Sequence, residues 1–172
     1  MRLPLTPGYC VDTSAWIDLW RRYPLEFFHD LWAEIERLAR QGELGSPREA
    51  RHELLRGHDG LAKWATEHES LFFDPDSEQI GLASELLERH PGFLDFDKEG
   101  PDADIWVVAM AIQFGWAVVT SERPARPGAR KRIPDMCAGE GTACMGVFGL
   151  FRELHIAFTL DGSTDAPTPP PA

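Results

Sequence analysis

Four carboxylates occupy positions from which they could act together. Asp12 ends the apolar run "YCVD", and Glu122 closes "WAVVTSE". Asp104 lies at the acidic start of "DADIWVVAMAIQFG", and Glu53 lies within "REARHELL". Clustered carboxylates cannot all be ionised unless a cation compensates them, and hard oxygen ligands favour Mg²⁺ or Mn²⁺. The set predicts a divalent-metal site suited to phosphodiester hydrolysis by an activated water.

Each of these acids also has a plain structural explanation. Asp12 could cap the helix that follows it, and Asp104 could stabilise a helix through the helix dipole. Glu53 could be a solvated helix position, and Glu49, one turn earlier, competes with it for an inward-facing role. The elements that position the acids therefore have to decide between these explanations.

Short apolar runs bounded by Gly, Pro or polar residues predict short strands over 8–12, 43–46, 71–74, 116–122 and near 143–148. Helical spacing of apolar residues predicts helices over 13–23, 24–42, 46–57, 60–70, 76–90, 102–115, 133–141 and 148–158. We expect Thr13 or Ser14 to cap the first helix, Pro24 to open the second, and Ser46 to cap the third with Pro47 at its first position.

Alternating strands and helices predict an α/β fold with three layers, in which helices cover both faces of a mostly parallel sheet of four to five strands. Ligands of such folds bind beyond the carboxyl ends of the strands. Asp12 and Glu122 are expected at those ends, and Asp104 and Glu53 lie on helices that could reach the same edge. The order of elements thus favours a shared site over four unrelated acids.

Length and composition fit one globular domain over 1–158, followed by a Pro-rich tail over 159–172 that we expect to be disordered. The net charge of -11 argues against general polyanion binding. Contact with nucleic acid would have to be local, and the candidate is a basic loop, unless it is simply a solvated surface. Its cations are Arg123, Arg126, Arg130, Lys131 and Arg132.

Other site types and locations are disfavoured. Cys10, Cys137 and Cys144 have no zinc-ligand spacing and are expected to be buried free thiols. The six histidines form no HxH or HExxH motif. No apolar stretch is long enough for a membrane span, and no secretory signal is visible, so we expect a soluble, cytoplasmic protein.

Four segments together resemble the PIN-domain ribonucleases, the fold of VapC-type toxins. "YCVDTSAWI" is similar to the family's first strand and acid, "SPREARHEL" to its second acidic motif, "DADIWVVAMA" to its buried helix, and "VVTSE" to its later strand end. The resemblance covers about residues 8–156. It is closest to a larger subgroup with "A-D-x-W-V-(I/V)-A" and "I-P-D-x-C", here "ADIWVVA" and "IPDMC".

The resemblance implies an Mg²⁺- or Mn²⁺-dependent endoribonuclease whose metal ligands are Asp12, Glu53 and Asp104. Glu122 stands where the family usually has a fourth aspartate, and Asp135 is its rival for that place. Thr13, Ser14 and Thr120 would be supporting hydroxyls, and Asp102 a loop acid. The implied partners are an RNA substrate, a cognate antitoxin and a second copy in a homodimer. A grip of the basic loop on the RNA backbone is suggested by composition alone.

The sequence bears on two alternatives. Haloacid-dehalogenase phosphatases also end their first strand with Asp but need a second Asp two positions on, and Ser14 at that position counts against them. A catalytically silent PIN-like module that binds RNA or protein is the other alternative.

An aromatic stripe, expected mainly in the core but able to serve as a partner surface, consists of Trp16, Trp20, Phe27, Phe28 and Trp32.

Overall fold

The structure, a computed structural model, describes residues 7–57, 59–93 and 103–158. Within these ranges five parallel strands form one sheet in the order β3-β2-β1-β4-β5. The strands are β1 Tyr9–Val11, β2 Leu44–Pro47, β3 Phe72–Phe73, β4 Ala117–Val119 and β5 Cys144–Met145. Asp102 and the expected tail over 159–172 lie outside the described residues.

The helices are α1 Thr13–Arg22, α2 His29–Arg40, α3 Arg48–Leu55, α4 Gly60–Glu67, α5 Ser77–Arg89, α6 Ala103–Phe114, α7 Ile133–Glu140 and α8 Val147–Glu153. Two 3-10 turns span Glu69–Leu71 and Pro91–Phe93. Each predicted strand and helix thus corresponds to an element of the described chain, although several are shorter than expected.

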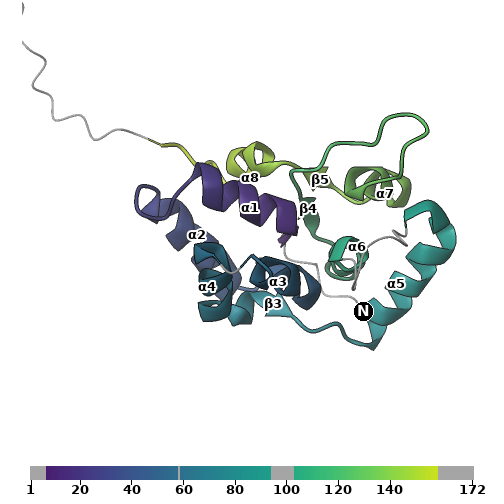
Figure 1. Cartoon of the computed structure of the whole chain (residues 1–172), viewed down its shortest axis with the longest axis horizontal. Coiled ribbons are helices and arrows are strands. Elements are labelled where there is room, and N and C mark those ends of the chain that lie inside the picture. Colours follow the sequence, from purple (N-terminus) through teal and green to yellow (C-terminus); the bar gives the residue numbers. More distant parts are fainter. Residues whose placement is uncertain (1–6, 58, 94–102, 159–172) are drawn as a thin grey trace, which may run out of the picture.

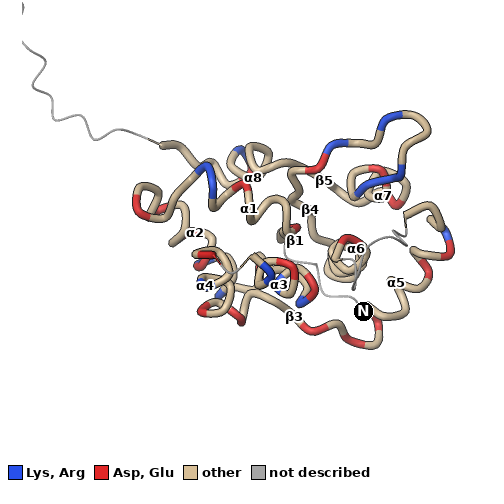
Figure 2. Tube along the Cα trace, in the orientation of Figure 1, with Lys and Arg blue, Asp and Glu red and all other residues tan. Residues whose placement is uncertain are grey.

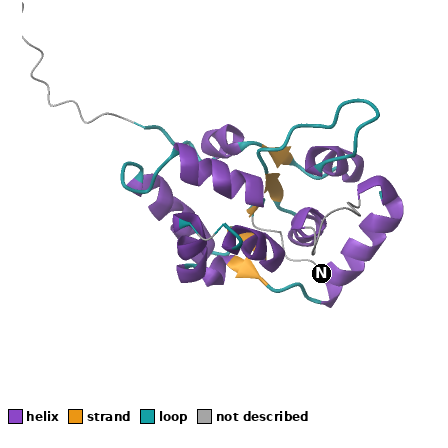
Figure 3. Cartoon of the chain, viewed as in Figure 1, coloured by secondary structure: helices purple, strands orange, loops and turns teal. Residues whose placement is uncertain are grey.

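Alternation along the strands divides the core into two layers of packing. Val11 and Val119 point to one face, where they pack with apolar side chains of α1, α2, α4 and α8. Cys10 and Val118 point to the other face and pack with side chains of α5, α6 and α7. Figures 1 and 3 show these two groups of helices on opposite sides of the strands. The predicted α/β fold with three layers is confirmed.

The second helix begins later than predicted. Pro24 does not open α2: its carbonyl accepts hydrogen bonds from the backbone N–H of Phe27 and of Phe28, which closes a single turn, and α2 starts at His29. The turn separates Phe27 from the aromatic stripe, and its side chain is 73% exposed. Trp16 and Trp32 are in the core as expected.

Two expected helix caps were wrong. Neither Thr13 nor Ser14 caps α1: Asp12 does, since its carboxylate accepts from the backbone N–H of Ser14. Ser46 does not cap α3, because its hydroxyl accepts from Trp16 Nε1 at 2.8 Å and donates to the Val11 carbonyl at 2.6 Å. Pro47 takes the N-cap position of α3 with no side-chain bond. In both places tertiary partners decide what the hydroxyl binds.

Among the residues that the structure describes, no helix is both long enough and apolar enough to cross a membrane.

Candidate active site

The carboxyl ends of β1 and β4 bring Asp12 and Thr120 together. The two strands are paired in register, Val11 opposite Val119, and the Asp12 backbone N–H donates to the Val119 carbonyl at 2.8 Å. The side chains that directly follow the two strands therefore meet at one edge of the sheet. This is the edge at which the parallel topology predicts a ligand site.

The Asp12 carboxylate is buried, 3% exposed, and only one of its oxygens is engaged. Oδ2 accepts hydrogen bonds from the hydroxyls of Ser14, at 2.5 Å, and Thr120, at 2.8 Å. Oδ1 accepts none from any described residue. Of the three hydroxyls that the sequence proposes as supports, Ser14 and Thr120 bond the Asp12 carboxylate. The buried Oγ1 of Thr13 has no hydrogen-bond partner among the described residues.

Burial disfavours the charged form of Asp12. Desolvation, with a smaller contribution from the charge of Glu122, raises the pKa of Asp12 from 3.8 to about 6, against the hydrogen bonds from Ser14 and Thr120. The influence of Glu122 places a second carboxylate within electrostatic reach. A positive charge at this position would favour both anions.

Asp104 and Glu122 line one cavity of about 840 Å³, which the basic loop encloses. Asp104 lies in the first turn of α6 and Glu122 in the loop after β4. Glu122 Oε2 accepts from the Ile133 N–H, at the start of α7, at 3.1 Å. Two of the predicted acids therefore face the same space, although Glu122 is held toward α7.

The acids of α3 are at the side of this region. Glu53 Oε1 accepts a long bond, 3.5 Å, from the Ala103 N–H at the start of α6, so the side chain is directed toward the helix that carries Asp104. Glu49 is more buried, 5% exposed; its Oε1 lies 3.5 Å from an Arg48 nitrogen, and its Oε2 has no hydrogen-bond partner among the described residues. Both acids remain candidates for the second acidic position.

The predicted ligands do not form a ready-made metal centre. In the described ranges, no three His, Cys, Asp or Glu side chains are grouped so that they would hold a metal ion. Two effects keep the predicted carboxylates apart: their negative charges repel one another, and the Ile133 N–H holds Glu122 by a hydrogen bond. The donor chemistry still suits a hard cation, because the residues concerned offer only oxygen atoms and no described residue donates a hydrogen bond to Asp12 Oδ1.

Asp135 has a structural explanation. Its Oδ2 accepts from the backbone N–H groups of Ala125 and Arg132, each at 2.9 Å, and so ties the basic loop to the first turn of α7. Although burial acts to raise the pKa of Asp135, these bonds and the charges of Lys131 and Arg132 hold it below the usual value. Asp135 is not among the residues lining the cavity of Asp104 and Glu122. This favours Glu122 over Asp135 as the fourth carboxylate of the predicted metal site.

We expect Asp135→Ala to loosen the basic loop. The change removes the oxygen that accepts from two backbone N–H groups, one of them at a helix start, a loss worth about 1 kcal/mol. Trypsin should then cut within 123–132 several-fold faster, as measured by mass spectrometry of the early fragments. Asp135→Asn keeps an acceptor oxygen and serves as the matched control with a smaller effect. Equal cleavage rates in all three proteins would contradict the tie.

The cations of the basic loop differ in how far their side chains are held by the rest of the fold. Figure 2 shows Lys and Arg concentrated along the segment between β4 and α7. Arg130 is committed to the fold: its guanidinium donates to the Phe93 carbonyl, from Nη2 at 2.9 Å, and lies over the Phe93 ring. Arg123, Arg126, Lys131 and Arg132 are exposed. These four are better placed than Arg130 to reach a ligand.

Sequence comparison assigns the chain to a family. A domain of unknown function, DUF4411, matches residues 9–158. The chain belongs to the DUF4411 family. A comparison with curated proteins finds no match. The DUF4411 match begins at β1 and ends after α8, so it includes all of the predicted site residues.

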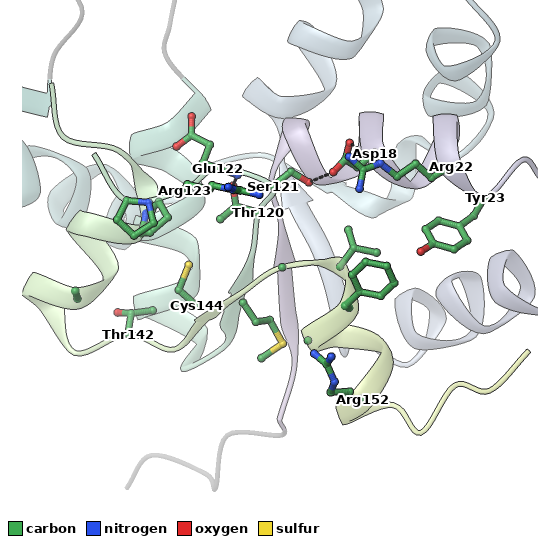
Figure 4. A pocket seen from close by; sticks show the side chains of 18 residues that line it. Asp18, Arg22, Tyr23, Thr120, Ser121, Glu122, Arg123, Thr142, Cys144 and Arg152 are labelled. Atoms are coloured by element: carbon green, nitrogen blue, oxygen red, sulfur yellow. Dashed lines mark hydrogen bonds and ion pairs between the residues drawn. The ribbon is translucent and has the colours of Figure 1, made fainter. Parts of the chain in front are cut away.

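In this DUF4411 domain, the structure adds site residues that the sequence did not indicate. Ser121 Oγ donates to Asp18 Oδ2 at 2.5 Å and so ties the loop after β4 to α1. Figure 4 shows this bond in a groove with Glu122 and Arg123 toward one end and Arg22 toward the other. Asp18 and Arg22 lie on α1 and follow ordinary helical spacing. Nothing in the sequence separates them from other surface positions.

Proposed function

We propose that the protein is a PIN-type, divalent-metal-dependent endoribonuclease. The observation that carries the proposal is Asp12, a buried carboxylate fixed at a strand end by Ser14 and Thr120, with the charge of Glu122 acting on it. A purely structural cap does not need to be buried, since Asp59 and Asp76 cap α4 and α5 of the same chain from more exposed positions. The burial of Asp12 has an energetic cost that a bound cation would offset.

Asp12, Asp104 and Glu122, with an acid of α3, are the residues that would hold Mg²⁺ or Mn²⁺. When bound, such an ion supplies Lewis acidity for a water nucleophile and for the phosphoryl oxygens. The chain itself contributes the rest of the arrangement. Ser14 and Thr120 orient the Asp12 carboxylate, and the exposed cations of the basic loop line the cavity in which Asp104 and Glu122 would face a phosphate.

RNA is proposed as the substrate on two grounds. The cations nearest the carboxylates form a local basic surface in an acidic chain, which fits a phosphodiester polymer held at one place. The resemblance to PIN ribonucleases supplies the choice of RNA. A role as the toxin of a toxin–antitoxin pair belongs to the same proposal, with the exposed Phe27 and Phe158, which line one hollow, as a surface for the antitoxin or a second copy.

The test is cleavage of a labelled single-stranded RNA by the purified protein. We expect cleavage with Mg²⁺ or Mn²⁺, none with EDTA, and a loss of at least about 100-fold in rate for Asp104→Asn, because metal coordination contributes several kcal/mol to such reactions. Asp30→Asn, an exposed acid in the first turn of α2, is the matched control and should keep the wild-type rate.

The alternative, a catalytically silent binding module, has a different outcome. The wild-type protein would then bind RNA or a protein partner without cutting any RNA offered, with or without metal. Cleavage that Asp104→Asn leaves unchanged would point to a contaminating nuclease and would also count against the proposal.

A further inference from the structure

We propose that the groove shown in Figure 4 binds single-stranded RNA on one side of the scissile bond. We call it the arginine groove and define it by Arg22 and Tyr23 at the end of α1, Arg123 after β4, and Phe148 and Arg152 of α8. The inference rests on the proposed ribonuclease function and names the path that the substrate takes. The basic loop would hold the strand on the other side of the bond.

Two hollows adjoin at shared lining residues. The arginine groove has a volume of about 820 Å³, and the cavity of Asp104 and the basic loop about 840 Å³. Glu122, Arg123 and Pro124 line both. A strand lying in the two hollows therefore passes over Glu122, next to the carboxylates proposed to act on the phosphodiester.

Charge favours a polyanion in the arginine groove. Three arginines line it against two acids, and both acids accept hydrogen bonds: Glu122 from the Ile133 N–H, and Asp18 from the Ser121 hydroxyl. Arg22 forms a loose pair with Asp18, at 3.6 Å and with its own side chain 63% exposed. Arg123 and Arg152 form no ion pair with any described residue. Three guanidinium groups are thus available for phosphates within a chain of net charge -11.

Aromatic side chains indicate that the strand is single. Phe148 lines the groove and is 59% exposed, although a ring of this size is usually buried. Tyr23, half-buried, lines the same groove. Unpaired bases stack on such rings with little regard to sequence, whereas the bases of a duplex are already stacked on one another. Guanidinium groups beside an exposed ring therefore fit single-stranded RNA.

The experiment measures affinity in EDTA, where cleavage does not interfere. A fluorescein-labelled single-stranded RNA of mixed sequence is titrated with the full-length chain, and fluorescence anisotropy gives Kd at several salt concentrations. We expect Arg22→Ala/Arg152→Ala to weaken binding about tenfold or more and to reduce the slope of log Kd against log salt by about 1.4, since each lost phosphate contact on a single strand accounts for about 0.7.

Matched variants separate the groove from general charge. The control Arg21→Ala/Arg40→Ala also removes two exposed arginines. Arg21 lies in the same turn of α1 as Arg22, and Arg40 forms an i,i+4 ion pair with Glu36 at 3.6 Å, as Arg22 does with Asp18. This variant should bind RNA as the wild type does. Phe148→Ala should weaken single-strand binding about fivefold or more, because stacking contributes at least about 1 kcal/mol per base. The same RNA as a duplex should be affected less.

Each outcome bears on the inference separately from the proposed function. If the wild type cleaves RNA but the groove variants keep wild-type Kd and KM, the groove assignment is wrong and the ribonuclease stands. Groove-dependent binding without any cleavage would support the groove and overturn the ribonuclease. A wild-type protein that neither binds nor cleaves RNA would overturn both.

Discussion

Replacing Asp12 by Asn is expected to slow RNA cleavage severely and, in the same protein, to stabilise the fold above pH 6. The carboxylate is buried and its pKa is raised from 3.8 to about 6, so folding at neutral pH carries the cost of a desolvated charge. A rise of about two units in the pKa corresponds to about 3 kcal/mol in the free energy of unfolding. Asn removes the charge and can still accept from Ser14 and Thr120 through its carbonyl oxygen.

The sign of the pH dependence follows from the raised pKa. Asp12 is protonated in both folded and unfolded chains below pH 3.8, where its favourable contribution is fully present. That contribution is lost as the pH rises through about 6, because the unfolded chain ionises more easily than the folded one. The difference in the free energy of unfolding between Asp12→Asn and wild type should therefore be small near pH 4 and reach its maximum above pH 6.

Urea unfolding in EDTA, followed by tryptophan fluorescence between pH 4 and 8, measures this difference. Asp30→Asn is the control, because an exposed acid should give no such pH-dependent gain. Replacing EDTA by Mg²⁺ should stabilise the wild type and leave Asp12→Asn nearly unchanged. Cleavage should fall about 1,000-fold in Asp12→Asn. A variant that is less stable than wild type across the whole pH range would contradict the cost assigned to the buried charge.

The fold was predictable because its determinants are local. Apolar runs such as "VVT" after Trp116 and the unbroken apolar surface of α6 specify buried elements without reference to distant residues. The strand β2, four residues long, follows from its place between two strongly periodic helices. Parallel topology then places Asp12, Thr120 and Glu122 at one edge, so the neighbourhood of the candidate site was accessible from the sequence.

The details that depend on distant partners were not predictable. The hydroxyl of Ser46 binds Trp16 and Val11 instead of capping α3, and the Asp12 cap is completed by Thr120. Helical spacing likewise says nothing about which arginine lines a groove formed by α1 and α8. Whether the acids act on a metal and RNA stays a prediction, since it depends on chemistry beyond the placement of these side chains.

Ser46→Ala is expected to lower the free energy of unfolding by about 2–4 kcal/mol, a large effect for the loss of one oxygen atom. Ser46 is fully buried, and its hydroxyl links Trp16 Nε1 to the carbonyl of Val11, the last residue of β1. Alanine leaves both groups without this partner in the core, at about 1–3 kcal/mol for each. Chemical denaturation at constant pH measures the change.

A matched control and a double-mutant cycle assign that effect to the hydrogen bonds. Ser84→Ala removes an exposed hydroxyl that bonds only the Ile80 carbonyl of its own helix, and it should change stability by less than about 0.5 kcal/mol. Trp16→Phe removes the N–H donor while keeping an aromatic ring, so Ser46→Ala should cost about 1 kcal/mol less in that background. Strict additivity would mean that the Trp16 bond contributes nothing. The end of β1, and with it the position of Asp12, would then depend on the backbone ladder and the Val11 bond alone.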